Sequence, residues 1–517
     1  MARPFDFGEI KLTVGGDASL AIPSPEKPSC IVLLGNFCGR SAEMRRESRI
    51  ANRRPVLVDG DSFDEVFAGL GAEISMPIGG SLPVTLRFSQ LGDFHPDRLF
   101  ERADLFRRLR EVRLHLHDPA AFAATAEELG VRPGPQTAAK PTAAATPSGI
   151  VASKFVHGRA GGLLEEIVER ANGRATGGRP SRAPEALQDF VQWVTQPHLA
   201  AAPDPRQAEL IGVIDRALSA QMRALLHVPA FQELEAAWRA LFFLVRRMKA
   251  GPQLKLYLVD ISKEELAADL NSSHDFGSSE AYRLLVEKTF GTPGSEPWAL
   301  IVGNYTFGPK REDAELLGRL ARMANAARAP FIAAASPRLQ GCASLGDTPN
   351  PRDWRVTPDT DGAVAWSALR RLPEACAIGL ALPRFLLRLP YGKKTDAIES
   401  FDFEETLGIP DHEDYLWGHP AFACAVLLAQ SFSEYGWEMR PGVHAQIDGL
   451  SLHVCEQDGE SALKPCAEAL LTEDAAARVL ENGLMPLASL KGRDAVRLVR
   501  FQSIAEPLRA LAGRWGG

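Results

Sequence analysis

The chain has 517 residues, more than one hydrophobic core normally serves, so its length predicts two to four domains. Hydrophobic residues make up 45% of it and charged residues 24%, so it can bury a real core and is not disordered overall. A formal net charge of -7 argues against nucleic acid as the main partner, because phosphate binding needs a dense basic face.

The seven cysteines are widely spaced, odd in number and without a C-x-x-C pair, which is typical of reduced thiols rather than of a disulfide framework. The first residues, MARPFDFGEI, lack the apolar core of a signal peptide, and the longest apolar stretches are far shorter than a membrane span. We therefore expect a soluble cytoplasmic protein without direct membrane insertion.

Residues 1–130 are predicted to contain a small α/β unit. Ile10, Leu12 and Val14 alternate with polar residues, as on a half-buried strand, and residues 30–34 form the continuous apolar run of a buried strand. A helix is expected over residues 61–70, an alternating strand over residues 84–88, and one long helix over residues 93–116.

Residues 131–184 change in composition to Pro, Ala, Thr, Gly and Arg, which predicts a linker that buries little. A short helical island at residues 163–170 interrupts it. This segment is expected to be a domain boundary.

A second folded region is predicted over residues 185–517. Apolar stripes indicate a helix over residues 207–227 and another that begins at Pro229. Strands and helices then alternate, with strands over residues 254–261, 298–305, 331–335 and 378–382. The predicted fold class is mixed α/β, with the small unit docked on a larger domain in which helices flank a mixed sheet.

The sequence contains no strong catalytic or metal-binding motif. Residues 391–395 (YGKKT) resemble part of a phosphate loop, but Leu387 stands where the first glycine belongs, and Lys394 where Ser or Thr belongs. His115 and His117 could hold a metal from one strand face, yet a pair without a third ligand is more often solvent-facing or satisfied by the protein. Acidic pairs such as Glu264-Glu265 and Glu404-Glu405 are interpreted as solvated helix faces or caps. We expect neither enzymatic activity nor a cofactor or metal, although separated residues could still meet in a catalytic cleft.

Tryptophans and arginine–proline phrases recur through the second region. Arg352 and Trp354 lie in PRDW, and Arg384 and Arg388 lie in LPRFLLRLPYG. Arginine beside aromatic rings is typical of well-packed interfaces, because the planar guanidinium group pairs with carboxylates and stacks on aromatic rings. These four residues are therefore interface candidates, and intramolecular scaffolding is the alternative role for each of them.

These phrases resemble the large (TssC/VipB-like) subunit of the type VI secretion contractile sheath. The resemblance covers about residues 207–487 in the family's order, beginning with residues 221–244 (QMRALLHVPAFQELEAAWRALFFL). It continues through ISKEEL at 261–266, GSEPW at 294–298, APFI at 329–332 and YLWG at 415–418. Residues 54–59 (RPVLVD) and 91–97 (LGDFHPD) are similar to phrases of the small (TssB/VipA-like) subunit. The chain is therefore expected to be a fusion of the two subunits.

The resemblance implies a structural role. Sheath units stack helically around a secreted tube protein, bind baseplate proteins, and contract without an active site. The expected partners are sheath subunits (of this chain or paralogous), the tube protein, the baseplate and an AAA+ recycling ATPase. Neighbouring units of the family exchange strands, and the strand at Ile10, Leu12 and Val14 is the candidate donor, with an internal edge strand as the alternative.

Two features set this chain apart from the family pattern. Large subunits continue beyond the segment that matches residues 483–487, so the resemblance implies a chain without their C-terminal region. A non-polymerising cap or assembly regulator is therefore an alternative function, and an unrecognised α/β enzyme is a second one. The segment with Leu163, Leu164, Ile167 and Val168 loosely resembles the part of the large subunit that the ATPase reads, with a plain linker helix as its alternative.

Overall fold

A computed structural model describes residues 27–39, 50–77, 83–129, 205–272, 276–287, 296–355, 360–408, 410–457 and 460–515. The chain divides into two compact units. The first contains Met1–Arg98, Ala224–Ile398 and Glu404–Gly517, and the second contains Leu99–Arg223 and Glu399–Phe403. Each unit draws on both regions that flank the expected linker, whose own residues, 131–184, lie outside the described ranges. The division of the chain at that linker stays a prediction.

The first unit contains the strands of the described chain. They are β1 (Ser29–Gly35), β2 (Val56–Val58), β3 (Ala72–Met76), β4 (Val84–Phe88), β5 (Leu254–Asp260), β6 (Trp298–Phe307), β7 (Phe331–Ala335), β8 (Ile378–Leu382), β9 (Phe385–Arg388), β10 (Leu416–Gly418), β11 (Gln446–Ile447), β12 (His453–Gln457), β13 (Glu460–Lys464), β14 (Met485–Ser489) and β15 (Val496–Leu498). Its longer helices are α2 (Phe63–Leu70), α9 (Pro229–Arg247), α10 (Lys263–Ser272), α13 (Arg311–Ala327), α14 (Asp361–Arg370), α15 (Pro420–Tyr435) and α16 (Glu473–Glu481).

Short helical turns connect these elements. They are η1 (Ile50–Asn52), η2 (Leu91–Phe94), η4 (Phe276–Ser278), α11 (Glu280–Tyr282), the π-helical turn η5 (Arg283–Glu287), η6 (Pro337–Gln340), η7 (Pro351–Asp353), η8 (Pro373–Ala377), η9 (His412–Asp414) and η10 (Gly436–Glu438). No helix in the described ranges combines the length and the apolar composition that crossing a bilayer requires.

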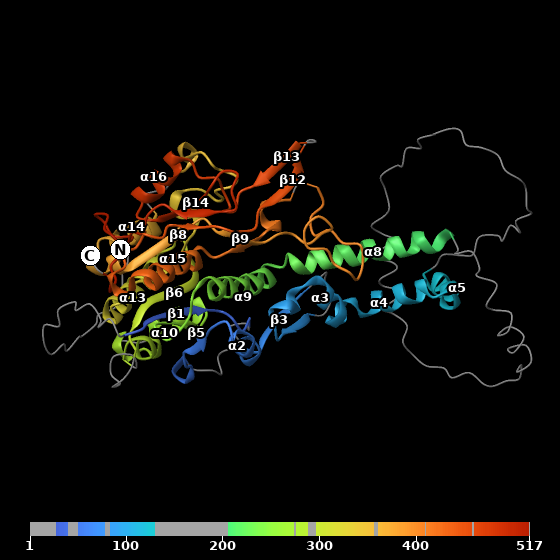
Figure 1. Ribbon diagram of the computed structural model, residues 1–517, viewed down its shortest axis with the longest axis horizontal. Helices are drawn as coiled ribbons and strands as arrows, with labels where there is room; N and C mark the ends of the chain where they lie inside the picture. Colours follow the sequence, from blue (N-terminus) through green and yellow to red (C-terminus); the bar gives the residue numbers. More distant parts are fainter. Residues whose placement is uncertain are drawn as a thin grey trace, which may run out of the picture. The chain divides into compact units, whose positions relative to one another are not determined.

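Nine strands form one mixed sheet in the order β11-β15-β14-β8-β7-β6-β1-β5-β2. Figure 1 labels β14, β8, β6, β1 and β5 among them. The strands from β14 through β8, β7, β6 and β1 to β5 run parallel, and antiparallel strands close both edges. Parallel strands need crossover connections, and the helices between them supply these. The mixed α/β class expected from the sequence is confirmed.

Strand β1 occupies an interior position of this sheet. All seven of its residues are buried, as a strand with neighbours on both edges and helices on both faces requires. Ser29 is in register with Leu254 of β5, and Leu34 with Gly303 of β6. A strand from the first 130 residues therefore separates two strands of the second region. The small N-terminal part is not merely docked on the larger one, because the two share a sheet.

Helices cover both faces of the sheet. Cys30, Val32 and Leu34 belong to the same hydrophobic cluster as the buried face of α13. The alternate residue Ile31 lines a small apolar crevice together with Leu428 and Phe432 of α15. The side chains of β1 thus fill both cores, as the two-residue period of a strand dictates.

The described part of the second unit is mainly helical. It contains α4 (Asp104–His117), α5 (Pro119–Glu128), the end of α3 (Pro96–Arg102) and most of α8 (Pro205–Leu226). Arg113 Nε of α4 donates to Asp215 Oδ1 of α8 at 2.7 Å, and Gln207 Nε2 of α8 donates to the carbonyl of Leu116 at 2.7 Å. A helix from each region of the chain therefore contributes to this unit as well.

The single helix expected over residues 93–116 was wrong. The structure has η2, α3 and α4 there, with extended backbone at His95 and Ala103. The side chain of Asp93 caps η2, and Pro96 opens α3, where its missing N–H is tolerated. His115 and His117 lie in the last turn of α4 rather than on a strand.

Candidate functional site

Trp238 is the centre of the contact between the two regions of the chain. It belongs to α9, is 0% exposed, and donates its indole N–H to the carbonyl of Phe37, just after β1, at 2.8 Å. Its ring lies over Phe67 with centroids 3.8 Å apart and meets the edges of Phe37 and Phe63 at 5.5 and 6.0 Å. These three phenyl rings come from the first 130 residues. The two regions are thus joined by a buried aromatic core as well as by the sheet.

A buried network of charges lies in the same unit. Arg388 at the end of β9 donates from Nε to Glu235 Oε1 at 2.8 Å and from an η nitrogen to Glu405 Oε2 at 2.7 Å. Arg239 also pairs with Glu235, at 2.6 Å, and donates to the hydroxyl of Tyr391 at 2.9 Å. Two guanidinium groups therefore balance two carboxylates that are almost fully removed from water.

The charges of this network depend on one another. Burial alone would raise the pKa of Glu405, but the charge of Arg388, the nearby ring of His227 and hydrogen bonds from Arg388 and the backbone of Tyr391 lower that pKa to about 2. Burial raises the pKa of the Tyr391 phenol to about 12. The Glu405 carboxylate therefore stays ionised at neutral pH. The network joins α9, β9 and the chain around residue 405.

The loop that partly resembles a phosphate loop is built around a carboxylate. A Cβ atom at Gly392 would lie 2.1 Å from Glu404 Oε2, so a larger residue there would have to displace the Glu404 side chain. The backbone N–H of Lys393 donates to Glu404 Oε1 at 3.1 Å. A backbone N–H of this loop is therefore engaged by a carboxylate of the same chain.

A groove of about 670 Å³ lies at the carboxyl ends of β1, β5 and β6. Asn36, Ser262 and Thr306 mark these strand ends, and the beginnings of α9, α10 and α15 form further walls. We call this cavity the strand-end groove. Its ionisable residues include Glu233, Lys263, Glu264, Arg384, Glu413 and Asp414.

His419 in the wall of this groove is held as a neutral ring. Its Nε2 lies 3.0 Å from the carbonyl of Tyr305, and its Nδ1 accepts the N–H of Ala421 at the start of α15. Removal from solvent lowers the pKa of His419 to about 4, and the charge of Arg384 adds to the shift. Protonation of Nδ1 would remove the lone pair that accepts the N–H of Ala421, and the start of α15 would lose this hydrogen bond.

Acidification should therefore weaken the fold through His419. The folded pKa of about 4 lies below the ordinary value of 6.5, so the stabilisation is complete above pH 6.5 and is lost as pH falls toward 4. We expect this group to remove roughly 2 kcal/mol of unfolding free energy between pH 7 and pH 5. Urea unfolding of the unaltered protein and of the variant His419→Gln at both pH values measures this loss of unfolding free energy. An equal pH dependence in both proteins would contradict the assignment.

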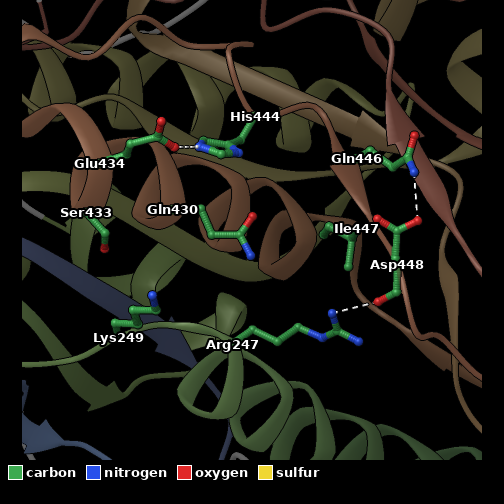
Figure 2. A pocket seen from close by; sticks show the side chains of 9 residues that line it. All are labelled: Arg247, Lys249, Gln430, Ser433, Glu434, His444, Gln446, Ile447 and Asp448. Atoms are coloured by element: carbon green, nitrogen blue, oxygen red, sulfur yellow. Dashed lines mark hydrogen bonds and ion pairs between the residues drawn. The ribbon is translucent and has the colours of Figure 1, made fainter.

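A second pocket, of about 590 Å³, lies beside the last turns of α9 and α15 and strand β11. Figure 2 shows Glu434 facing His444, with Oε2 and Nε2 2.6 Å apart, and Arg247 donating to the carbonyl of Asp448 at 2.8 Å. The hydroxyl of Ser433 donates to the carbonyl of Ala429 in its own helix at 2.9 Å. These polar side chains of the pocket are thus held by partners within the chain, and its hydroxyl is engaged by a backbone carbonyl.

Comparison with protein families gives two matches. Residues 208–505 match the VipB model, described as "EvpB/VC_A0108, tail sheath N-terminal domain". That match covers more than half of the chain. The chain belongs to the VipB tail sheath family. Residues 12–129 match a second model, described as "Type VI secretion system, VipA, VC_A0107 or Hcp2".

A curated relative supports membership of the sheath family. The chain is 38% identical over 304 residues to the protein named type VI secretion system sheath protein TssC1 of Pseudomonas aeruginosa. The similarity covers 58% of this chain and 61% of that relative. The resemblance to a fused small and large sheath subunit, drawn from the sequence, is confirmed.

The four interface candidates of this sheath-family chain differ in accessibility. Trp354 is 1% exposed and donates its indole N–H to the carbonyl of Thr348 at 2.8 Å, and Arg388 is enclosed by the charge network. Arg352 is exposed in η7. Arg384 is partly exposed and pairs with Glu468 at 2.5 Å. Trp354 and Arg388 make intramolecular contacts, whereas Arg352 and Arg384 stay interface predictions.

The remaining candidates lie outside the described residues. These are the strand donor Ile10, Leu12 and Val14 and the ATPase-recognition candidate Leu163, Leu164, Ile167 and Val168. Both assignments stay predictions.

Sequence reasoning identified Arg388, with intramolecular scaffolding as one of its two roles, but missed the acidic members of the buried network. Glu405 was expected on a solvated face or at a cap, but it is 1% exposed and pairs with Arg388. Glu265 accepts the backbone N–H of Ser262 at the start of α10, which confirms the expected cap, and it also pairs with Arg53 at 2.5 Å. Glu264 is exposed in the first turn of α10, as expected. A useful signal would have been Arg388 itself, since an arginine within an apolar strand needs buried carboxylates around it.

Proposed function

We propose that this chain is a structural, non-enzymatic subunit of a type VI secretion sheath, in which the small and large subunit regions form one building block. The observation that carries this proposal is the position of β1 between β5 and β6. A subunit whose two regions share a sheet can transmit force without the regions separating. Such a role depends on binding surfaces and not on catalytic groups.

Assembly is proposed to occur in the cytoplasm through contacts between copies or with paralogous sheath subunits. Heterologous, non-closing contacts between identical units build a helix. Arg352 and Arg384 are the accessible candidates on the described surface for such contacts. The tube protein, baseplate proteins and a recycling ATPase belong to the same proposal as further partners.

Strand exchange would supply part of these contacts. The hairpin β12–β13 forms a two-stranded sheet of its own, and its opposed residues Val454 and Leu463 are 55% and 51% exposed. An isolated hairpin with an exposed apolar face is a suitable acceptor for an added strand. The segment with Ile10, Leu12 and Val14 is the proposed donor.

Electron microscopy of the purified full chain, alone and with sheath subunits from the same gene cluster, tests this function. We expect helical tubes, and we expect Leu12→Pro to reduce their number because proline cannot donate to a strand ladder. Decoration confined to one end of tubes formed by other subunits would favour the cap. Monomers that bind no sheath or baseplate component would contradict the proposal.

A further inference from the structure

The strand-end groove carries more negative charge than the residues around it neutralise. Both of its cations are engaged, because Lys263 Nζ lies 2.6 Å from Asp313 and Arg384 lies 2.5 Å from Glu468. Glu233, Glu264 and Glu413 are exposed along the groove. Within the described part of the chain, Glu233 and Glu264 have no ion-pair partner, and Glu413 approaches only Arg384, at 3.7 Å.

The carboxylates of this groove also affect one another. Partial removal from solvent raises the pKa of Glu233, and the charge of Glu264 raises it further. These two side chains come from different helices, α9 and α10. A cation placed between them would relieve a repulsion that folding itself creates.

The chain contains a segment of matching charge. Residues 170–182 (RANGRATGGRPSR) carry four arginines and no acidic residue, and their glycines let a backbone approach a wall closely. We propose that this segment docks in the strand-end groove of its own chain, with arginine side chains paired to Glu233, Glu264 and Glu413. The linker would then be fastened to the body instead of only tethering two regions.

Chain geometry allows this contact within one molecule. Helix α8 has 22 residues and is therefore about 33 Å long, and His227, directly after its end, lines the groove. Residues 183–204 can span about 75 Å when fully extended. The groove thus lies within that span.

Tethering makes a weak contact effective. A segment held at this range has an effective concentration on the order of millimolar. A contact with a dissociation constant of about 0.1 mM would then be occupied roughly tenfold more often than empty. Exposed ion pairs of this kind are screened by salt, so the contact should weaken at high ionic strength.

Limited trypsin digestion of the full chain tests the docking. Rates of cleavage after Arg170, Arg174 and Arg182 are compared by mass spectrometry with cleavage after Lys154 and Arg159 of the same linker. We expect the first three sites to be cut about tenfold more slowly at low salt. The triple variant Glu233→Gln, Glu264→Gln, Glu413→Gln, or 0.5 M sodium chloride, should abolish that difference.

A matched control neutralises three exposed carboxylates elsewhere, in the variant Glu111→Gln, Glu438→Gln, Glu481→Gln, and should keep the protection. Thermal melting of both triple variants checks that they remain folded. Equal cleavage at all linker sites of the unaltered chain would overturn the proposal. Protection that rises with protein concentration would assign the groove to another copy and would overturn docking within one chain.

Zero-length cross-linking supplies a test that leaves the groove unchanged. In the variant Arg174→Lys, Arg179→Lys, a carbodiimide should join the new amines to Glu233, Glu264 or Glu413. Cross-links found only to other carboxylates would contradict the docking. None of these measurements depends on polymerisation. The docking can therefore be refuted while the proposed sheath function stands, and the sheath function can be refuted while the docking stands.

Discussion

Replacement of Trp238 by alanine is expected to lower the free energy of unfolding by about 3–5 kcal/mol, the usual cost of removing a large aromatic side chain from a core. The indole is fully buried, so its loss leaves a cavity against Phe67 and deprives the carbonyl of Phe37 of its donor. Because the lost contacts join α9 to the first 130 residues, both regions should lose stability together. Urea unfolding followed by far-ultraviolet circular dichroism measures the change.

The variant Trp238→Phe separates the two contributions. It keeps an aromatic ring beside Phe63 and Phe67 but cannot donate to Phe37, so we expect a loss of about 1–3 kcal/mol. A loss below 1 kcal/mol in the alanine variant would mean that Trp238 contributes little to the junction. That result would contradict the shared core.

The second large effect is expected at Arg388. Its replacement by alanine leaves Glu235 and Glu405 buried without their shared partner, which typically costs about 3–5 kcal/mol. The variant Arg388→Lys keeps the charge but not the planar fork that meets both carboxylates, so its loss should be smaller and still measurable.

The pH dependence of the unfolding free energy of the Arg388→Ala variant distinguishes loss of the charge network from simple loss of packing. Unpaired buried carboxylates have raised pKa values, so acid neutralises them and removes the penalty. In the unaltered protein the pKa of Glu405 is about 2 and no such gain occurs. The stability difference between the two proteins should therefore shrink from pH 7 to pH 5. A constant difference would argue against the charge network as its cause.

Elements with strong local patterns could be predicted from the sequence. The apolar run of β1 and the stripe of α9 identified both elements, and Pro229 marked the start of α9 correctly. The expected break-free helix over residues 93–116 failed because extended backbone at His95 and Ala103 interrupts a continuous helical spacing.

The contact between the first 130 residues and the second region could not be predicted, because it depends on residues that are far apart in the sequence. Nothing near Cys30 indicates that β1 pairs with Leu254 on one side and with β6 on the other. Glu405 has the same local surroundings as a solvated acid, and its burial depends on Arg388, which also pairs with Glu235 from a distant segment of the chain. Contacts between segments that are far apart in the sequence decide whether such a residue is buried and structural or exposed to solvent.

The interior place of β1 has a consequence for biosynthesis. Its neighbours in the sheet begin at Leu254 and Trp298, so during translation the completed β1 has no strand to pair with. At bacterial elongation speeds this wait lasts roughly 10–50 s. A largely apolar, unpaired strand is prone to aggregate over that interval, so the nascent chain should require chaperone protection until β5 and β6 emerge from the ribosome.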